Sequence, residues 1–382
     1  MNIVEVIKRV ATVFEPKEDP MFSFSIEKQK GFLENLCLPK DDIERSYNQY
    51  LCQRAMRKKL FSFVSNIASG VIILFYIIRT YSRKHELVKR YNAIFLHDGK
   101  NNSIIPTSLR VEYGDIIRSD GQDYVLTTWD LKYIFDVWKR YPFSMEFLLK
   151  NIIKIARYRA LVIKNNPDAI IVCVEYSYTS SLLTDWCSKN GVHHINVMHG
   201  EKLFYIRDSF FRFHKCYVWD NYYIELFIKL RADVEQFIVE VPEALHFSEK
   251  RYYNKEIDFT YYLMNESKEE LIKILDVMKQ LKNKGYNVAV RPHPRYSDIP
   301  SVNALFEGVT CIEDGNVVSI EESILRTKNT ISLYSTVLNQ AYHNGVNIVI
   351  DDVSDKNKYN KLYELQYRIM YITDKKLLSE IL

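Results

Sequence analysis

Two short polar segments of this sequence follow apolar runs and carry side chains that suit an anionic ligand. The first is Arg-Pro-His-Pro-Arg, in which Arg291 and Arg295 supply fixed positive charge and the prolines keep His293 out of a helix. The second is the hydroxyl pair Ser335 and Thr336, which precedes a predicted helix, and helix N-termini bind phosphate readily. Because ligands bind at the carboxyl ends of strands in open α/β sheets, these segments predict half of a phosphate-binding cleft.

A plainer interpretation of the same residues stays open. Both segments could be ordinary strand-to-helix turns, with Ser335 or Thr336 as an N-cap and the two arginines on the surface. Their recurrence in neighbouring βα units of the predicted fold favours the cleft.

Two further residues are candidates for acid-base chemistry at strand ends. Glu175 follows the apolar run 169–174, where partial desolvation would raise its pKa towards the range of a general base. His199 follows the predicted strand 194–198, and Gly200 beside it allows a close backbone approach. A solvated or capping glutamate and a hydrogen-bonded structural histidine remain the alternatives.

The elements that position these residues form two repeating patterns of short apolar strands and helices. Such alternation is typical of parallel sheets with helices on both faces, so the predicted class is α/β with two Rossmann-like lobes that face a central cleft. Neither GxGxxG nor a Walker motif occurs, which argues against dehydrogenases and P-loop NTPases. The predicted organisation is an N-terminal helical extension at 1–90, an acceptor lobe at 91–241, a linker at 242–257 and a nucleotide-sugar-binding lobe at 258–382.

An uncharged segment at 60–78 lies between basic residues in the N-terminal extension. It has 19 residues, just enough to span a bilayer, but its serines, asparagine and glycine leave only 71–78 densely apolar. A buried helix, an interfacial attachment and a membrane span are all compatible with this pattern. Peripheral membrane contact would suit an enzyme that acts on lipid-linked acceptors.

Composition narrows the class of protein further. The 382 residues are 47% hydrophobic and carry a net charge of only +4, and no nucleic-acid-binding motif is present, so no nucleic-acid partner is expected. The six cysteines form no CxxC pair and are typical of reduced thiols, and the charged residues among the first sixteen argue against a signal peptide. We expect a cytoplasmic protein, with the inner face of the plasma membrane as its place of contact. No cluster predicts a catalytic metal, and no cofactor is expected.

Three short motifs resemble the signatures of bacterial sialyltransferases and polysialyltransferases. These are His293-Pro294, Ser335-Thr336 and Glu313-Asp314-Gly315, which match a His-Pro pair, two hydroxyl residues and an acid-acid-glycine triplet. In that family the acidic motif precedes His-Pro and supplies the base, whereas here Glu313 follows it. Asp98 and Glu175 precede His293 in the sequence, as the family pattern requires, but neither matches the full acidic motif. Glu175 is therefore the predicted base, and Asp98 and Glu313 are the alternatives for this role.

The loops around His199 and His293 also look like the histidine loops of CDP-glycerol-type polyol-phosphate transferases, which share the GT-B fold. Together the resemblances imply an inverting, metal-independent glycosyl transfer from a nucleotide sugar, with CMP-sialic acid favoured, to a glycan or lipid-linked glycan of a bacterial O-antigen, capsule or lipooligosaccharide. Glu175 would remove the acceptor proton, and His293 would assist the departing phosphate. Ser335 and Thr336 would hold that phosphate, and Arg291 or Arg295 would neutralise charge on the phosphate or on a sugar carboxylate. His199 would orient the acceptor or act as base. Polyol-phosphate transfer from a CDP-alcohol and a non-catalytic GT-B-like scaffold are the alternatives.

Overall fold

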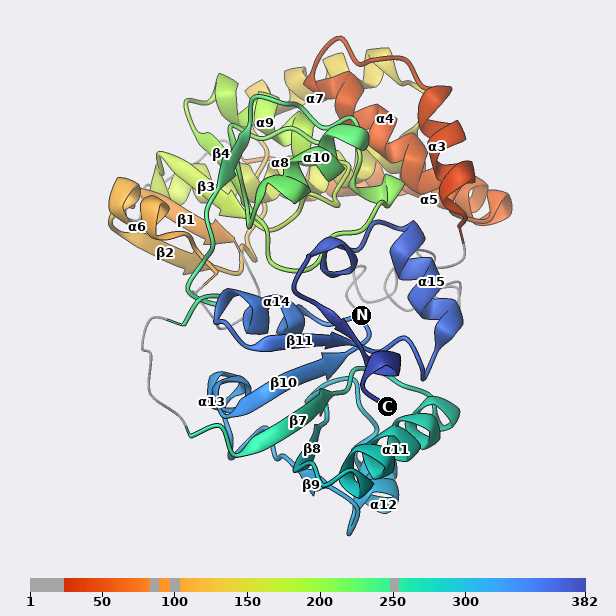
Figure 1. The fold of residues 1–382 in the computed structure, drawn as a ribbon. Coiled ribbons are helices and arrows are strands. Elements are labelled where there is room, and N and C mark those ends of the chain that lie inside the picture. Colours follow the sequence, from red (N-terminus) through yellow and green to blue (C-terminus); the bar gives the residue numbers. More distant parts are fainter. Residues whose placement is uncertain (1–23, 83–88, 97–103, 248–253) are drawn as a thin grey trace. The chain divides into compact units, whose positions relative to one another are not determined.

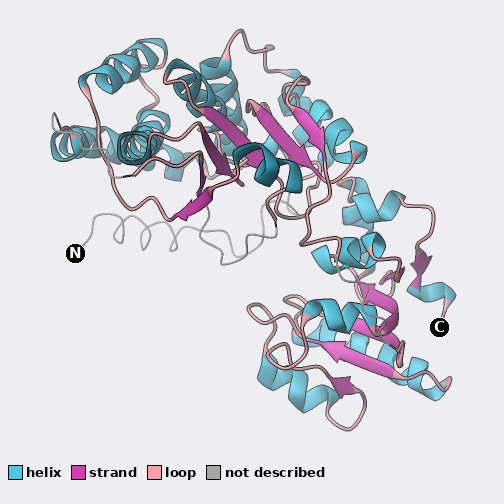
Figure 2. Ribbon diagram, turned by 90° about the vertical axis from the view of Figure 1, so that its left-hand side faces the viewer, coloured by secondary structure: helices cyan, strands magenta, loops and turns pink. Residues whose placement is uncertain are grey.

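The computed structural model describes residues 24–82, 89–96, 104–247 and 254–382 (Figure 1). The chain divides into two compact units. Unit 1 contains the residues up to Met198 together with Tyr205–Glu240, and unit 2 contains His199–Phe204 and Val241–Leu382. Each unit has one six-stranded parallel sheet with helices packed around it (Figure 2). The predicted α/β class with two Rossmann-like lobes is confirmed.

The sheet of unit 1 has the order β2-β1-β3-β4-β5-β6. The order of its strands reverses between β1 and β3, which places the crevice suited to a ligand at the carboxyl ends of these two strands. Strands β1 and β3 consist entirely of buried residues, as expected for a parallel sheet covered on both faces. The strands of unit 1 are β1 (Ala93–Leu96), β2 (Ile116–Ser119), β3 (Ala169–Val172), β4 (His193–Val197), β5 (Lys215–Val218) and β6 (Phe237–Val239).

The helices of unit 1 include the N-terminal ones predicted as a separate extension. Helix α4 packs on α9, and α5 packs on α8. Helix α5 contains the apolar segment 60–78, but most of its length is exposed, so the interpretation as a buried helix is wrong. The helices are α3 (Ile26–Glu34), α4 (Asp42–Ala55), α5 (Lys59–Thr80), α6 (Thr107–Tyr113), α7 (Thr128–Arg140), α8 (Met145–Asn165), α9 (Ser180–Lys189) and α10 (Asn221–Lys229).

The sheet of unit 2 has the order β12-β11-β10-β7-β8-β9. Its strand order reverses between β7 and β10, so the ligand crevice expected for such a sheet lies at their carboxyl ends. Its strands are β7 (Ile257–Tyr262), β8 (Val288–Arg291), β9 (Cys311–Ile312), β10 (Thr327–Ser332), β11 (Asn347–Ile350) and β12 (Lys376–Leu377).

Helices cover both faces of the unit 2 sheet (Figure 1). Helix α11 contacts α12, and α13 contacts α14. Ser267 caps α11 through a capping box with Glu270, and the apolar face of this helix, from Leu271 to Leu281, joins the core beneath the sheet. The helices are α11 (Lys268–Asn283), α12 (Ile299–Phe306), α13 (Ile320–Leu325), α14 (Thr336–His343) and α15 (Lys356–Glu364).

The predicted linker begins as part of unit 2. Side chains of α14 hold it: the Gln340 amide donates to the Ala244 carbonyl at 2.9 Å, and Asn344 bonds both to the Leu245 carbonyl and to the Phe247 amide. Residues 248–253 of the predicted linker lie outside the described residues.

Two histidines of unit 1, the buried His194 and the partly buried His214, have pKa values below the usual value. The ring of His194 bonds to the Tyr158 hydroxyl at 2.9 Å and to Thr184 at 2.8 Å, and its backbone N–H donates to Nδ1 of His214. Burial holds the pKa of His194 well below its usual value. Burial, with His193 nearby, lowers the pKa of His214 to about 4.

We therefore predict that unit 1 loses stability on mild acidification. Both folded-state pKa values lie below the unfolded value near 6.5, so the unfolded chain binds more protons. Stability is fully present above about pH 6.5 and falls towards pH 4, by at most about 1.4 kcal/mol per pH unit for each group. All four tryptophans belong to unit 1, so urea unfolding followed by tryptophan fluorescence between pH 7 and 5 reports this unit. His214→Asn should reduce the dependence of the unfolding free energy on pH, and His246→Gln, at an exposed site in unit 2, should not. A urea midpoint of unit 1 that does not change with pH would contradict this prediction.

Candidate functional site at the carboxyl edge of unit 2

The carboxyl ends of β8, β7 and β10 meet at one edge of the unit 2 sheet. Tyr262 pairs with Arg291 of β8, and Tyr261 pairs with Ile331 of β10, so the three strands end level with one another. His293 follows β8 and Ser335 follows β10. The two segments are not on neighbouring strands, since β7 lies between them, and their backbones are separated by two strand spacings, about 10 Å. The structure therefore brings both polar segments to the strand-order reversal of one sheet.

His293 is held in a defined orientation on the loop after β8. Its ring stacks on Tyr296 with centroids 4.5 Å apart, and its Nδ1 accepts the backbone N–H of Arg295 at 3.1 Å. Its own backbone N–H donates to Ser297, whose hydroxyl donates to the Met264 carbonyl after β7. Burial and the charge of Arg295 lower the pKa of His293. With Nδ1 as acceptor, the network assigns the ring proton to Nε2, so His293 is a neutral hydrogen-bond donor.

Arg291 lies beneath this loop in a buried ion network. Its guanidinium bonds to the Glu313 carboxylate at 3.3 Å and to the Val318 carbonyl at 2.8 Å. Arg326 reaches the other oxygen of Glu313 at 2.8 Å, and Ser323 donates to the same carboxylate. Two positive charges therefore share the buried carboxylate, and Glu322, 3.8 Å from Arg326, adds a second negative charge to the network. Arg295 is exposed, whereas Arg291 points into the protein.

The triplet Glu313-Asp314-Gly315 of the predicted motif forms a turn next to this ion network. Asp314 accepts from the backbone N–H and the side-chain amide of Asn316, and Gly315 lies close to the Arg291 guanidinium. The carboxylate of Glu313 is fully buried as a counter-ion for two arginines. In this position it has no open path to an acceptor hydroxyl.

Ser335 caps α14. Its side chain accepts from the backbone N–H of Val337 at 3.2 Å, and its carbonyl accepts the Tyr367 hydroxyl at 3.2 Å. Thr336 is the first residue of the helix and is partly exposed. The capping interpretation of Ser335 is thus correct, and it is compatible with a ligand site, because a capping hydroxyl can still donate its proton and the positive helix end lies at this edge.

Sequence reasoning missed one acidic residue at this edge. Glu266, in the loop after β7, accepts the backbone N–H of Met264 with both oxygens, and burial raises its pKa. Asp351 follows a predicted strand, and there the sequence favours a solvated turn over a ligand for ribose or a metal. The solvated turn is wrong, because Asp351 is fully buried and accepts from Tyr261 and from the backbone of Ser354. Among the described residues, no three His, Cys, Asp or Glu side chains are grouped to hold a metal ion.

Glu175 stands at the carboxyl edge of the unit 1 sheet, but it is not open to solvent. Its side chain is fully buried and accepts from the Asn196 amide at 3.1 Å. From α4, the Gln49 amide donates both to the Glu175 carbonyl and to the Arg207 carbonyl. The expected exposure to a cleft is therefore absent, because α4 packs over the end of β3.

The remaining predicted residues have different surroundings. His199 is exposed and begins the segment 199–204, which belongs to unit 2, where the Phe204 N–H donates to the Leu365 carbonyl at 2.6 Å. Asp98 lies outside the described residues.

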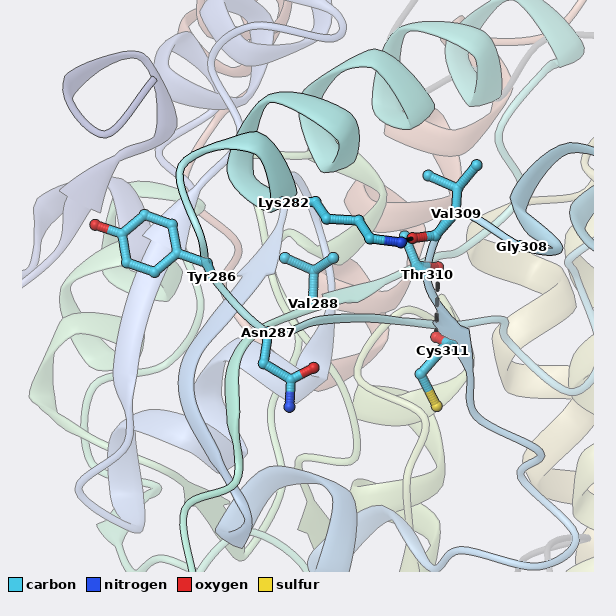
Figure 3. Close-up of a pocket in the computed structure, with 8 residues that line it drawn as sticks. All are labelled: Lys282, Tyr286, Asn287, Val288, Gly308, Val309, Thr310 and Cys311. Carbon is cyan, nitrogen blue, oxygen red and sulfur yellow. Dashed lines mark hydrogen bonds between the residues drawn. The ribbon is translucent and has the colours of Figure 1, made fainter.

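A hollow of about 240 Å³ opens at the opposite edge of the unit 2 sheet (Figure 3). It is lined by the first residues of β8 and β9, Val288 and Cys311, and by Lys282, whose ammonium donates to the Val309 carbonyl at 2.8 Å. Amino ends of strands are not where open α/β sheets bind ligands, so this hollow is not our candidate site.

Comparison with known proteins gives similarity of fold only. No protein-family model matches the chain, and no curated protein sequence does. Among solved structures, the wall teichoic acid polymerase TagF aligns over 85% of this chain and 88% of its own at 13% identity, with a TM-score of 0.46. S. aureus MnaA in complex with UDP aligns over 73% and 88% at 11% identity and a TM-score of 0.45. The UDP-GlcNAc 2-epimerase of Neisseria meningitidis bound to UDP-GlcNAc aligns over 72% and 85% at 9% identity and a TM-score of 0.41.

We predict that Glu313 is essential for the stability of unit 2. Glu313→Ala leaves two arginines without their shared counter-ion, which should lower the free energy of unfolding of this unit by about 3–5 kcal/mol. Glu322→Gln is the matched control, because Glu322 is partly exposed and meets Arg326 only at 3.8 Å, so its effect should stay below about 1 kcal/mol.

Urea unfolding followed by circular dichroism measures the loss, while tryptophan fluorescence reports unit 1 separately. Equal effects of Glu313→Ala and Glu322→Gln would show that the buried network does not stabilise unit 2.

Proposed function

We propose that the chain is a nucleotide-sugar-dependent inverting glycosyltransferase of GT-B-like architecture that acts on a bacterial surface polysaccharide. The observation that supports the proposal is that the His293 loop and the N-terminus of α14 lie at the carboxyl edge of one sheet, with only the end of β7 between them. A donor phosphate placed there would meet a positive helix end, the hydroxyls of Ser335 and Thr336, and an imidazole donor.

His293 takes the part of a hydrogen-bond donor to the leaving group. In the transfer, the bond between the anomeric carbon and the donor phosphate oxygen breaks, and the acceptor oxygen forms the new bond from the opposite side. Negative charge then develops on the departing phosphate. The Nε2–H of His293, the helix end and the exposed charge of Arg295 favour that charge.

Two residues are candidates for the base that takes the acceptor's proton. Glu175 is the prediction from sequence, but its carboxylate is buried and bonded to Asn196. His199 is exposed, which favours it for contact with an incoming acceptor. Replacement of each residue by Gln distinguishes the two candidates. Replacement of the base should lower the rate of transfer by about 10²–10⁴, and replacement of the other residue should leave most of the activity.

The finer proposal for the donor is CMP-sialic acid, which the His-Pro and Ser-Thr motifs support. Polyol-phosphate transfer from a CDP-alcohol is the second candidate. Two observations favour this second candidate. His199, which would be its base, is exposed. Glu313 of the acidic motif is buried against two arginines, so its carboxylate does not face an acceptor.

We predict that thermal unfolding will identify the donor class. A bound ligand at 100 times its Kd stabilises the folded chain by about 2.7 kcal/mol. CMP and CMP-sialic acid should raise the unfolding temperature, and CDP-glycerol should not. Protection by CDP-glycerol alone would favour the second candidate. Absence of both protection and nucleotide release across a panel of nucleotide sugars would favour a non-catalytic scaffold.

We also predict that His293→Gln lowers kcat by about 10²–10³ while donor binding changes little, because the lost hydrogen bond forms mainly to charge that develops in the transition state. The lowered pKa of His293 keeps it neutral at pH 7. If the protonation state of His293 controls the rate, kcat should be constant above about pH 6.5 and should fall on acidification. The fall is expected because a proton on Nδ1 breaks the hydrogen bond from the Arg295 N–H, which orients the ring. The matched control is His246→Gln, at an exposed histidine of the same unit. Unchanged kcat in His293→Gln would remove His293 from the mechanism.

A further inference from the structure

Helix α5 carries a continuous row of exposed apolar side chains. The members recur every three or four residues and therefore share one face of the helix. The helix has 22 residues, a length of about 33 Å. Each side chain of the row is more than half exposed, and the row consists of Leu60, Phe63, Val64, Ile67, Val71, Leu74, Phe75 and Ile78.

The opposite face fixes the orientation of this row. Asn66 donates to the Phe143 carbonyl at 2.8 Å and accepts the Glu146 N–H at 3.1 Å, both beside the start of α8. Gly70 lies against Met145, where an added Cβ would be 3.5 Å from its side chain. Small and polar residues together with Ile73 thus face the protein, and the large apolar residues of the row face outwards. Phe143 is itself 87% exposed and extends the apolar surface next to Asn66.

Basic residues border the exposed row at both ends. Arg54, Lys58 and Lys59 precede it and Arg79 follows it, with no acidic residue anywhere from 54 to 80. Arg57 is paired with Glu146 of α8 at 2.5 Å. Two copies of α5 packed face to face would bring like charges together in either orientation, which disfavours a second copy as the partner. Anionic lipid headgroups complement this pattern.

We propose that α5 docks unit 1 on an anionic phospholipid surface. The helix lies in the plane of the interface, with the exposed row among the acyl chains and the basic ends at the headgroups. A membrane-spanning arrangement would separate α5 from α8 and break both hydrogen bonds of Asn66. The proposal does not depend on the proposed transfer reaction.

Co-sedimentation of the full chain with vesicles tests the docking. Binding is expected to vesicles of phosphatidylglycerol and phosphatidylcholine and to be weak with phosphatidylcholine alone. Replacement of Phe63, Ile67 and Leu74 by Gln should lower the partition coefficient tenfold or more. These side chains are exposed, so circular dichroism and the unfolding temperature should not change. Val111→Gln, at an exposed valine of α6, is the matched control.

A second variant tests the charge. Lys58→Gln with Lys59→Gln should weaken binding to the anionic vesicles about tenfold and remove most of its dependence on salt. Equal binding of the apolar variant, or no binding by the unchanged chain, would overturn the proposal.

Thiol labelling identifies other occupants of the face. Ile67→Cys, in a chain with the exposed Cys37 and Cys311 replaced by Ser, should react quickly with a maleimide in solution and slowly with anionic vesicles present. Slow labelling without vesicles would mean that another part of the chain covers the row. Self-association without lipid that the apolar variant abolishes would mean that a second copy does. Either result overturns the lipid assignment, and resistance of the bound chain to alkaline carbonate would overturn the in-plane arrangement.

Discussion

The parallel direction of the strands in unit 2 is the constraint on which the candidate site depends. A parallel sheet brings every strand's carboxyl end to one edge, and the order of the sheet determines which loops meet there. In unit 2 the chain moves outwards through β8 and β9 and then returns to the other side of β7 with β10. His293 and Ser335, 42 positions apart in sequence, therefore lie at one edge with only the end of β7 between them.

Rigidity at this edge comes from buried polar contacts beneath the loop. Burial of an isolated charge is costly, and a buried pair is stable only when its remaining hydrogen-bonding groups are satisfied. The carboxylate of Glu313 meets that condition through Arg291, Arg326 and Ser323, whereas Nε of Arg326 is buried without a partner among the described residues. Ser297 then connects the His293 backbone to the loop after β7. The loop therefore holds its shape without a ligand, which lowers the entropic cost of binding one.

The local pattern of the sequence was sufficient to predict the strands β1, β3, β4, β5, β7, β8, β9, β10 and β11, because each is a short apolar run next to a polar turn. It did not predict β2, β6 or β12, which are edge strands with little buried surface. It also placed Glu175 at an open edge, since nothing near residue 175 indicates that Gln49 and Gln53 of α4 cover it. Likewise, the triplet at Glu313 gave no indication that two arginines would enclose its carboxylate. Contacts between distant segments decided these cases.

The segment 60–78 shows why hydropathy alone could not choose among a core helix, an interfacial helix and a span. All three need a long uncharged run, and they differ in which side of the helix is covered. Here the covered side contains Ser62, Ser69 and Asn66 together with the buried Ile73, while the eight large apolar residues of the row are exposed. A soluble core would select the reverse distribution. Since α5 belongs to unit 1, the predicted acceptor lobe, docking through this face would hold that lobe at the surface where a lipid-linked acceptor resides.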